Sequence, residues 1–373
     1  MDVDPEQKYP TVGVLNRGRG LLYRDSVAGS ATAYKKLNRI GPSMLVYSRL
    51  KAFEGAITVT PDDLPESFAS QEFPTFAFAS DADPDFFRIL TTMERMWDAL
   101  QGASKGMGGR RERVKPADFL NIVMDIPPLP VQKRIVEAIG AVDDQISALN
   151  EEAEALDRVS MAVASDMLSG EPIVALGTAL DDIRGGKSPQ ANKWPPGADE
   201  FGVLKVSAVT PFRFLPEESK SLLPGTFMPA SALVQPGDVL ITRANTPLRV
   251  GAVTRVPADV RNGLYLADKT LRLVPSSKLD PDFLVVAMAL KAARNHLMSS
   301  ATGTSASMVN VSQDRIRETP IPLPDLDRQR EVASAVLSVR ANTDAARAEA
   351  TRLRKARSGL LSGLLDQSIT IDV

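Results

Sequence analysis

The chain has 373 residues, a net charge of −2 and no cysteine, with 43 % hydrophobic and 24 % charged residues. These values are typical of an ordinary globular protein with two or three domains. The absence of cysteine excludes disulfides and thiolate metal sites. The net charge is also not that of a simple nucleic-acid binder, which would be strongly positive. No apolar run is long enough to span a membrane, and the acidic N-terminal residues do not resemble a secretory signal. The composition therefore predicts a cytoplasmic protein.

Charge is unevenly distributed along the chain. Residues 1–125 carry a net −1, residues 126–172 a net −6, residues 173–320 a net +4 and residues 321–373 a net +1. The acidity therefore lies mainly on one segment, and this asymmetry can separate a scaffold from a binding surface.

The first 125 residues contain short runs of β-branched and aromatic residues bounded by glycine and proline. Such runs predict strands, and they lie at residues 12–15, 44–49, 55–59 and 73–78. Asp83 followed by Pro84 predicts a helix start, and we expect this helix to continue to about Leu100. A basic, glycine-rich segment then occupies residues 104–115.

A proline-rich segment, Ile126-Pro-Pro-Leu-Pro-Val-Gln132, precedes a long helix-patterned run. Its apolar positions recur in alternating steps of four and three residues from Ile135 to Met167, which is the pattern of a coiled coil. The prolines fix the entrance, and Gly170 with Pro172 closes the helix. We expect a helix over residues 131–168, about 38 residues and about 57 Å long.

The second half of the chain repeats this plan. Leu323-Pro-Asp-Leu-Asp-Arg-Gln329 corresponds to the first proline-rich segment, with the two glutamines 197 residues apart, and the same four-three rhythm follows it. Asp280-Pro-Asp-Phe283 likewise corresponds to Asp83-Pro-Asp-Phe86 at the same interval. The sequence therefore predicts a duplicated unit in which one mixed domain precedes one long helix.

The two halves differ at their beginnings. About thirty residues, including Gly185-Gly-Lys-Ser-Pro189, precede Gly202, whereas twelve precede Gly13. The first domain therefore lacks the strand and loop with which its counterpart begins. Three explanations remain open: the tail from Ser368 to Val373 supplies a closing strand, the gene start is displaced, or the first domain is impaired.

Together these features resemble the specificity subunit of type I restriction–modification systems, over nearly the whole chain. The most specific motifs are the two proline-rich entries ending in Gln132 and Gln329. Supporting motifs are Leu168-Ser-Gly170, Leu361-Ser-Gly363, Leu176-Gly-Thr-Ala-Leu180 and Pro236-Gly-Asp-Val-Leu240.

The resemblance implies an α+β fold with two mixed α/β target recognition domains, separated by two long antiparallel coiled-coil helices. The domains would be residues 1–125 and 173–320, and the helical segments residues 126–172 and 321–373, the last including the tail. Each recognition domain would bind half of a bipartite double-stranded DNA site. The chain would tether methyltransferase subunits, two of them, and restriction subunits. S-adenosylmethionine, ATP and magnesium would be bound by those partners, with no cofactor on this chain.

The paired helices would act as a ruler between the two recognition domains. Their length of about 57 Å is an upper bound on the separation, and one DNA turn is about 34–36 Å. We therefore expect the half-sites to lie between one and two turns apart, and an insertion of four residues after Asn150 should change the spacer.

Ten basic residues are candidates for DNA contact, because arginine and lysine bind phosphates and arginine also binds guanine. Five lie in the glycine-rich segment, where the alternative is a solvated surface loop, and its counterpart at residues 299–307 carries hydroxyls and no cation. The others lie at strand ends or in the glycine-rich turn of the second domain. The candidates are Arg49, Lys51, Lys105, Arg110, Arg111, Arg113, Lys115, Lys187, Arg243 and Arg249.

Catalytic motifs are incomplete. Asp181 stands where a phosphate-binding loop ending in Lys187 needs glycine, so nucleotide binding is rejected. His296 is the only histidine, and Glu218-Ser-Lys220 lacks the preceding Pro-Asp of a nuclease. A non-enzymatic role is predicted. The alternatives are a DNA nuclease, which would cleave DNA alone with Mg²⁺, and a standalone DNA-binding scaffold, which would not bind a methyltransferase.

Overall fold

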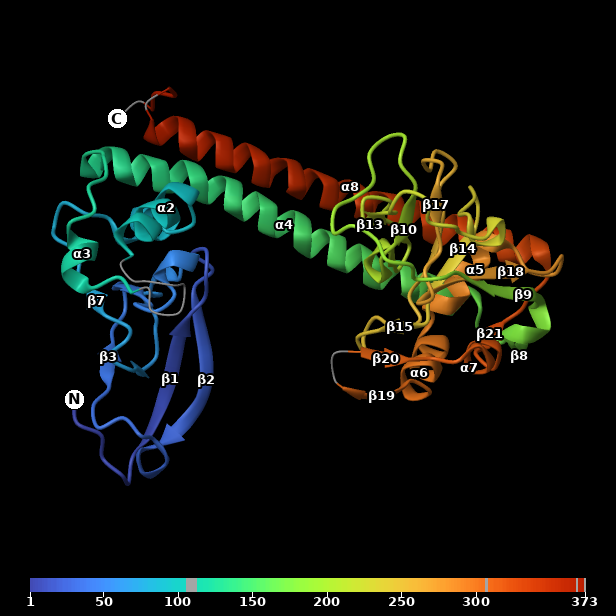
Figure 1. Ribbon diagram of the computed structural model, residues 1–373, viewed down its shortest axis with the longest axis horizontal. Helices are drawn as coiled ribbons and strands as arrows, with labels where there is room; N and C mark the ends of the chain where they lie inside the picture. Colours follow the sequence, from blue (N-terminus) through green and yellow to red (C-terminus); the bar gives the residue numbers. More distant parts are fainter. Residues whose placement is uncertain (105–112, 306–307, 367, 372–373) are drawn as a thin grey trace. The chain divides into compact units, whose positions relative to one another are not determined.

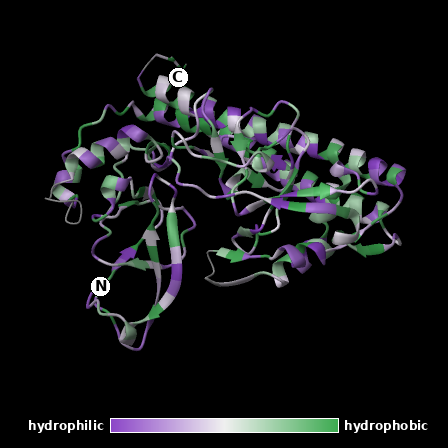
Figure 2. Cartoon of the chain, turned by 45° about the vertical axis from the view of Figure 1, so that its right-hand side comes forward, coloured by the Kyte–Doolittle hydropathy of each residue, from purple (hydrophilic) through white to green (hydrophobic). Residues whose placement is uncertain are grey.

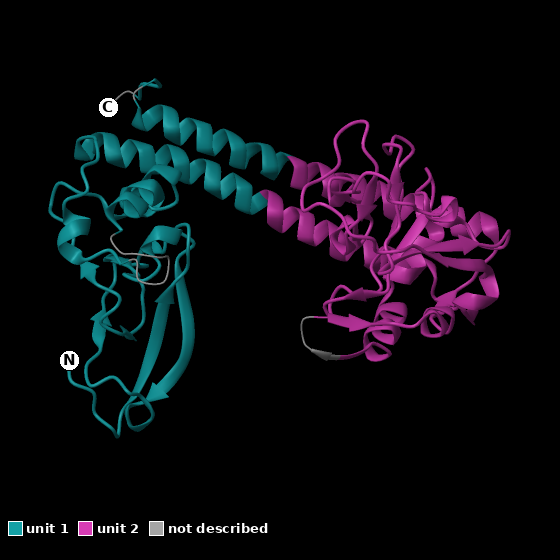
Figure 3. Cartoon of the chain, viewed as in Figure 1, with its two compact units in different colours: residues 1–148, 349–373 teal, residues 149–348 magenta. Residues whose placement is uncertain are grey.

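The computed structural model describes residues 1–104, 113–305, 308–366 and 368–371. The chain divides into two compact units (Figure 3). Unit 1 contains Met1–Ala148 and Glu349–Val373, and unit 2 contains Leu149–Ala348. Each unit therefore holds a globular part and one half of each of the two long helices, α4 (Leu129–Met167) and α8 (Leu326–Leu365), which are labelled in Figure 1.

The globular part of unit 1 contains two sheets. One has the strand order β2-β1-β6-β3 and the other β5-β4-β7. The strands are β1 (Lys8–Val14), β2 (Leu21–Ala28), β3 (Asn38–Ile40), β4 (Leu45–Tyr47), β5 (Ile57–Val59), β6 (Ser67–Ala69) and β7 (Thr75–Phe76). Three helices follow: α1 (Pro84–Leu90), α2 (Glu94–Ala103) and α3 (Pro116–Leu120). The strands expected from the sequence at residues 12–15, 44–49, 55–59 and 73–78 are confirmed.

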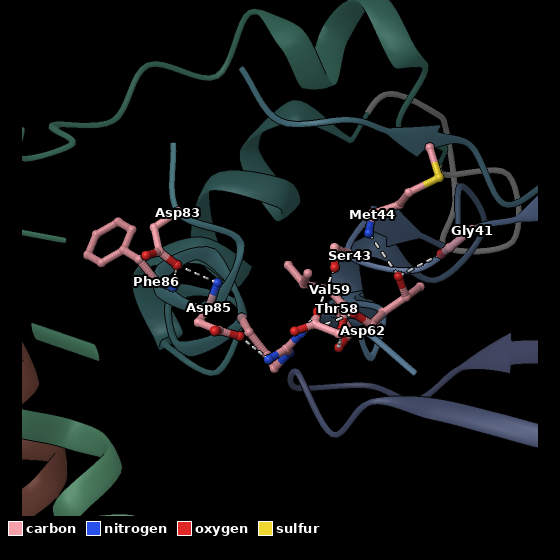
Figure 4. A network of polar contacts seen from close by, with 11 residues as sticks. Gly41, Ser43, Met44, Thr58, Val59, Asp62, Asp83, Asp85 and Phe86 are labelled. Carbon is pink, nitrogen blue, oxygen red and sulfur yellow. Dashed lines mark hydrogen bonds and ion pairs between the residues drawn. The ribbon is translucent and has the colours of Figure 1, made fainter. Parts of the chain in front are cut away.

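A polar network joins α1 to the second sheet of unit 1 (Figure 4). The Arg88 guanidinium donates to the Thr60 carbonyl at 3.1 Å and lies 3.4 Å from the Asp62 carboxylate. Ser43 donates to the same carboxylate at 2.5 Å, and this bond, with Arg88, lowers the pKa of Asp62. The network holds the last turn of α1 beside the start of β4 and the end of β5.

The prediction of a single helix from Asp83 to Leu100 is wrong, because the helix is interrupted between α1 and α2. The hydroxyls of Thr91 and Thr92 donate to the carbonyls of Arg88 and Ile89, each at 2.7 Å. Threonine side chains that bond to nearby backbone carbonyls compete with helix continuation. The Trp97 indole then donates to the Thr91 carbonyl at 2.8 Å, which fixes the bend.

Unit 2 has more strands. Its largest sheet has the order β16-β14-β18-β9, and smaller sheets have the orders β13-β10-β17, β15-β20-β19, β11-β12 and β21-β8. The strands are β8 (Ile173–Ala175), β9 (Leu180–Gly185), β10 (Gly202–Leu204), β11 (Val209–Thr210), β12 (Arg213–Phe214), β13 (Ser219–Ser221), β14 (Val239–Thr242), β15 (Ala244–Asn245), β16 (Val253–Arg255), β17 (Leu264–Tyr265), β18 (Thr270–Pro275), β19 (Thr302–Ser305), β20 (Met308–Asn310) and β21 (Pro320–Pro322). The helices are α5 (Pro281–Ala289), α6 (Lys291–Ser299) and α7 (Gln313–Arg317).

The two long helices pack against each other and against the globular part inside each unit. In unit 1, Ile135 and Ile139 of α4 join Leu361 and Leu364 of α8 in one core. In unit 2, Ala164 of α4 joins Val332 and Val336 of α8 in another. Every position of the two predicted four-three runs is buried or half-buried. Hydrophobic and hydrophilic residues alternate along both helices (Figure 2), as expected for helices with one buried face.

A buried glutamine joins each long helix to its globular part. The Gln132 amide accepts from the Asp83 N–H at 2.8 Å and donates to the carbonyls of Pro127 at 2.8 Å and Asp81 at 3.2 Å. Gln329 repeats these contacts in unit 2. It accepts from the Asp280 N–H at 2.8 Å and donates to the carbonyls of Pro324 at 2.8 Å and Lys278 at 2.9 Å.

We predict that Gln329→Ala lowers the free energy of unfolding by about 2–4 kcal/mol, because it leaves buried backbone groups without partners. The midpoint of urea unfolding, followed by circular dichroism, measures the loss. Gln145→Ala, on the exposed side of α4, is the matched control and should change stability by less than about 0.5 kcal/mol. Equal midpoints for the two variants would show that the buried amide contributes little.

Candidate nucleic-acid interface

A polar cleft of about 480 Å³ opens on unit 2. Three basic side chains line it, together with hydroxyl and amide groups. The polar lining residues are Lys205, Ser207, Thr210, Lys220, Asn245, Thr246 and Arg249. The cleft is therefore suited to an anion that also offers hydrogen-bonding groups, as a nucleic-acid backbone and its bases do.

Strand pairing places Lys220 in the cleft. The antiparallel pair β10–β13 sets Val203 opposite Lys220. Because side chains alternate across a strand, the neighbours Ser219 and Ser221 point inward and are buried at 0 % and 2 % exposure, while Lys220 is exposed.

The loop that carries Arg249 is held from behind by another arginine. Arg294 of α6 donates to the Val250 carbonyl at 2.7 Å and to the Leu248 carbonyl at 3.0 Å, and burial lowers the pKa of Arg294. Gly251 closes the loop with a φ of +71°, and a Cβ there would lie 2.6 Å from the Leu297 side chain. Only glycine fits this position, so Arg249 is presented on a rigid loop.

One carboxylate borders the cleft. Glu218 lies 3.6 Å from the Lys205 ammonium and accepts from the Ser207 hydroxyl at 2.5 Å. The Ser207 hydrogen bond is the main cause that lowers the pKa of Glu218, and Lys205 adds to it. Glu218 is therefore ionised at neutral pH, and it fixes the Lys205 side chain at the cleft edge.

One of the three candidates predicted in the second domain lies in the cleft. That residue is Arg249. Arg243 is half-buried after β14. Its N–H donates to the Lys269 carbonyl at 2.9 Å, and its carbonyl accepts from Val311 at 2.8 Å. Lys187 is exposed on the loop after β9, where the neighbouring Ser188 bonds to Asp268, and it does not line the cleft.

Of the candidates in the first domain, Arg49 and Arg113 meet at Glu72. The Arg49 N–H donates to the Glu72 carbonyl at 2.9 Å, and the Arg113 guanidinium lies 3.4 Å from the Glu72 carboxylate. Lys51 is exposed and pairs with Glu54 at 3.2 Å, and Lys115 is exposed before α3. Lys105, Arg110 and Arg111 lie outside the described residues.

Sequence reasoning missed six of the seven polar cleft residues: Lys205, Ser207, Thr210, Lys220, Asn245 and Thr246. In the sequence, Glu218-Ser-Lys220 resembles only part of a nuclease motif. The available signal was the single lysine between two serines in a short strand, which predicts one outward-pointing cation. His296, the only histidine, contacts the Arg315 carbonyl at 2.9 Å, and the described residues contain no group of metal-ligating side chains.

The chain is similar to several specificity subunits of type I restriction enzymes. The resemblance predicted from the sequence is therefore confirmed. The EcoEI specificity subunit of Escherichia coli is 30 % identical over 164 residues, 43 % of this chain and 27 % of that protein. The EcoKI specificity subunit of Escherichia coli strain K12 is 26 % identical over 269 residues, 65 % of this chain and 56 % of that protein. This chain thus spans between about a quarter and about half of the length of these two relatives. No protein-family profile matches it.

One solved structure agrees on the fold, and a second is similar over most of its length. A chain from a study of complex assembly and conformational transition of the type I R-M system matches 97 % of this chain and 92 % of its own length, with a TM-score of 0.55 at 19 % identity. The HsdS subunit from Thermoanaerobacter tengcongensis matches 97 % of this chain and 91 % of its own length, with a TM-score of 0.41 at 18 % identity. The expectation of mixed α and β structure with two long helices is confirmed. No helix in the described ranges is long and apolar enough to cross a membrane.

We predict that Ser207→Ala raises the pKa of Glu218 toward its usual range, because the carboxylate loses the hydrogen bond that most favours its charged form. Titration of the carboxyl carbon shift by NMR measures this change. Ser165→Ala, whose hydroxyl bonds to the Met161 carbonyl in α4, is the control. An unchanged Glu218 titration in Ser207→Ala would contradict the assigned cause.

Proposed function

We propose that the chain is the DNA sequence-recognition subunit of a type I restriction–modification complex, and that it has no catalytic activity of its own. The observation that carries the proposal is the cationic cleft of unit 2, in a chain similar to specificity subunits. Lys220 and Arg249 would neutralise phosphates, while Asn245 and Thr246 would contact base edges. This division is general, because phosphate contacts position a protein on DNA and base contacts specify the sequence.

We propose that the DNA site is bipartite and that each globular part binds one half. Residues 1–125 and 173–320 would be the recognition domains, and residues 126–172 and 321–373 the helical segments between them. The recurrence of the glutamine contacts supports this duplication, as does the pair of Val114 and Val311. Each of these valines donates its N–H to the carbonyl of the arginine after the matching strand, at 3.1 Å to Arg49 and 2.8 Å to Arg243.

Unit 1 would use a different set of cations for its half-site. Arg49 and Arg113 lie beside Glu72, and the glycine-rich segment containing Lys105, Arg110 and Arg111 connects directly to Arg113. Arginine forks onto guanine or phosphate, so this segment supports base or backbone contact.

The chain would also tether two methyltransferase subunits and the restriction subunits. S-adenosylmethionine, ATP and magnesium would be bound by those partners. The outward faces of the long helices supply charged docking surfaces. Glu151, Glu152 and Glu154 are exposed on α4, and Arg352, Arg354 and Lys355 on α8. Capture of the chain by a methyltransferase expressed with it would distinguish this role from that of a standalone scaffold.

We predict that Lys220→Ala combined with Arg249→Ala weakens binding to DNA that contains the methylated motif by about tenfold or more. The slope of log K against log salt should also become less steep, by the amount expected for the loss of about two phosphate contacts. Fluorescence anisotropy with duplex DNA across a salt series gives both quantities. Lys291→Ala, an exposed cation of α6 that does not line the cleft, is the control. A double variant with unchanged affinity and salt dependence would rule out the cleft as the DNA site.

We predict that four residues inserted after Asn150 of α4, matched by four after Ala350 of α8, lengthen the spacer of the methylated motif by about two base pairs. The insertion adds about 6 Å of helix, and base pairs are about 3.4 Å apart. Mapping of methylated adenines in host DNA reads the motif. A four-residue insertion after Gly225, in an exposed turn, should leave the spacer unchanged. If the helix insertions also leave it unchanged, the helices do not set the half-site separation.

A further inference from the structure

Among the described residues, one sheet of unit 1 ends in an edge strand at a place where its counterpart in unit 2 has one strand more. In unit 2 the order is β16-β14-β18-β9, whereas in unit 1 it is β5-β4-β7. The strands β5, β4 and β7 of unit 1 correspond to β16, β14 and β18 of unit 2, and residue pairs across these strands match. Phe76 lies opposite Leu45 of β4, and Leu273 lies opposite Val239 of β14. Phe76 and Leu273 are 197 residues apart, like the two buried glutamines.

The fourth strand of unit 2 shows what this edge accepts. In β9, Ile183 pairs with Leu273, and the strand runs antiparallel to β18. The preceding residues turn inward, so that Leu176 and Ala179 are buried at 0 % exposure and Ile183 at 6 %. This segment, residues 176–183, covers α7 and the residues that follow it. A Cβ on Gly177 would lie 2.9 Å from the Arg317 side chain.

The matching surface of unit 1 is left open. Ile316 and Ile321 are fully buried in unit 2, whereas their counterparts, Phe119 and Met124, are only half-buried. Leu120 is 67 % exposed. This difference in burial at matched positions indicates that the described part of unit 1 lacks one covering segment.

A groove of about 240 Å³ lies at this place in unit 1. Its lining is apolar throughout and runs from β7 to the start of α4: Leu45, Phe76, Ala77, Phe78, Phe87, Met96, Phe119, Leu120, Ile122, Met124 and Ile126. The described tail, residues 368–371, forms no strand. Ile369 and Ile371 lie instead against a neighbouring surface with Met124 and Pro127. The tail therefore does not line the groove.

The backbone of β7 also directs hydrogen-bonding groups along the groove that pair with no strand of the described residues. The carbonyls of Glu72 and Pro74 accept from Arg49 and Tyr47, so they face β4. Alternate residues of a strand present their backbone groups to opposite sides, so the N–H groups of Thr75 and Ala77 face the open edge. An extended peptide can add to such an edge and place its alternate side chains in the adjoining pockets.

We propose that this groove, named the β7 groove, binds an extended segment that residues 1–373 do not supply. The segment would add as an antiparallel strand on β7. It would carry apolar side chains at the spacing of Leu176, Ala179 and Ile183, with a small residue at the place of Gly177. The occupant is apolar because the β7 groove has no charged lining residue.

A synthetic peptide with the sequence of residues 172–185 is the probe, labelled with fluorescein and added to the full chain without DNA. Saturable binding by fluorescence anisotropy is expected. Leu120→Asp and Ala77→Pro should each weaken it by about tenfold or more, because one places a charge in the groove and the other removes an edge donor. Leu120 and Ala77 are exposed, so both variants should fold, and circular dichroism verifies this.

Phe227→Asp, at a side chain of unit 2 that is 82 % exposed, is the matched control and should bind the peptide like the parent chain. A peptide with aspartate in place of Leu176 and Ile183 should not bind. The proposal is overturned if the parent chain does not bind the first peptide saturably, or if both groove variants bind it unchanged. If sedimentation velocity shows a dimer of the chain that the peptide dissociates, the proposal is overturned in favour of a second copy of residues 1–373 as the occupant. DNA is absent, so these results do not depend on the proposed DNA recognition.

Discussion

Two buried glutamine side chains determine how each long helix leaves its globular part. Gln132 and Gln329 each satisfy one backbone N–H and two backbone carbonyls at partly or fully buried places. The N–H belongs to Asp83 or Asp280, the cap of the helix that packs on the sheet. A buried amide with three matched partners has one orientation, because rotating it leaves polar groups unpaired. The direction of the long helix is therefore tied to the sheet and its first helix.

Charged pairs add specificity to the contact between α4 and α8. Asp143 binds Arg357 with two hydrogen bonds in unit 1, at 2.6 and 2.8 Å. In unit 2, Asp157 lies 3.1 Å from Arg340 and 2.5 Å from Arg347. Asp143 and Arg340 are 197 residues apart, so matching places carry opposite charges. Two copies of α8 paired antiparallel would set arginine opposite arginine, which favours the pairing of α4 with α8.

Arg340 also links the helices of unit 2 to its globular part. Its guanidinium lies 3.9 Å from the ring centroid of Phe212, a residue held at a φ of +61°. Burial lowers the pKa of Arg340, and the neighbouring Asp157 carboxylate opposes this shift. A desolvated guanidinium over an aromatic ring contributes about 2 kcal/mol. The position of the strand pair β11–β12 on the helices therefore depends on this contact and on apolar packing.

Local signals in the sequence predicted the regular elements well. The four-three rhythm predicted α4 to within two residues at each end, since a helix 39 residues long repeats one signal many times. The break after α1 was missed, because Thr91 and Thr92 end the helix through their own hydroxyl bonds rather than through a proline or glycine. The cleft was also missed. Lys205, Lys220 and Arg249 come from three separate segments, and only the pairing of β10 with β13 and the Arg294-held loop bring them together.

Matching places in the two units show how one backbone plan can serve two different surfaces. Trp97 and Arg294 are 197 residues apart, and each side chain lies against a glycine with positive φ, Gly55 or Gly251. Trp97 donates to the Thr91 carbonyl, whereas Arg294 donates to the loop that presents Arg249. The glycine is required in both places because a Cβ would collide, but the residue against it can change. Backbone contacts are therefore retained while the side chains that pack on them diverge, and this is what the proposed recognition of two different half-sites would require.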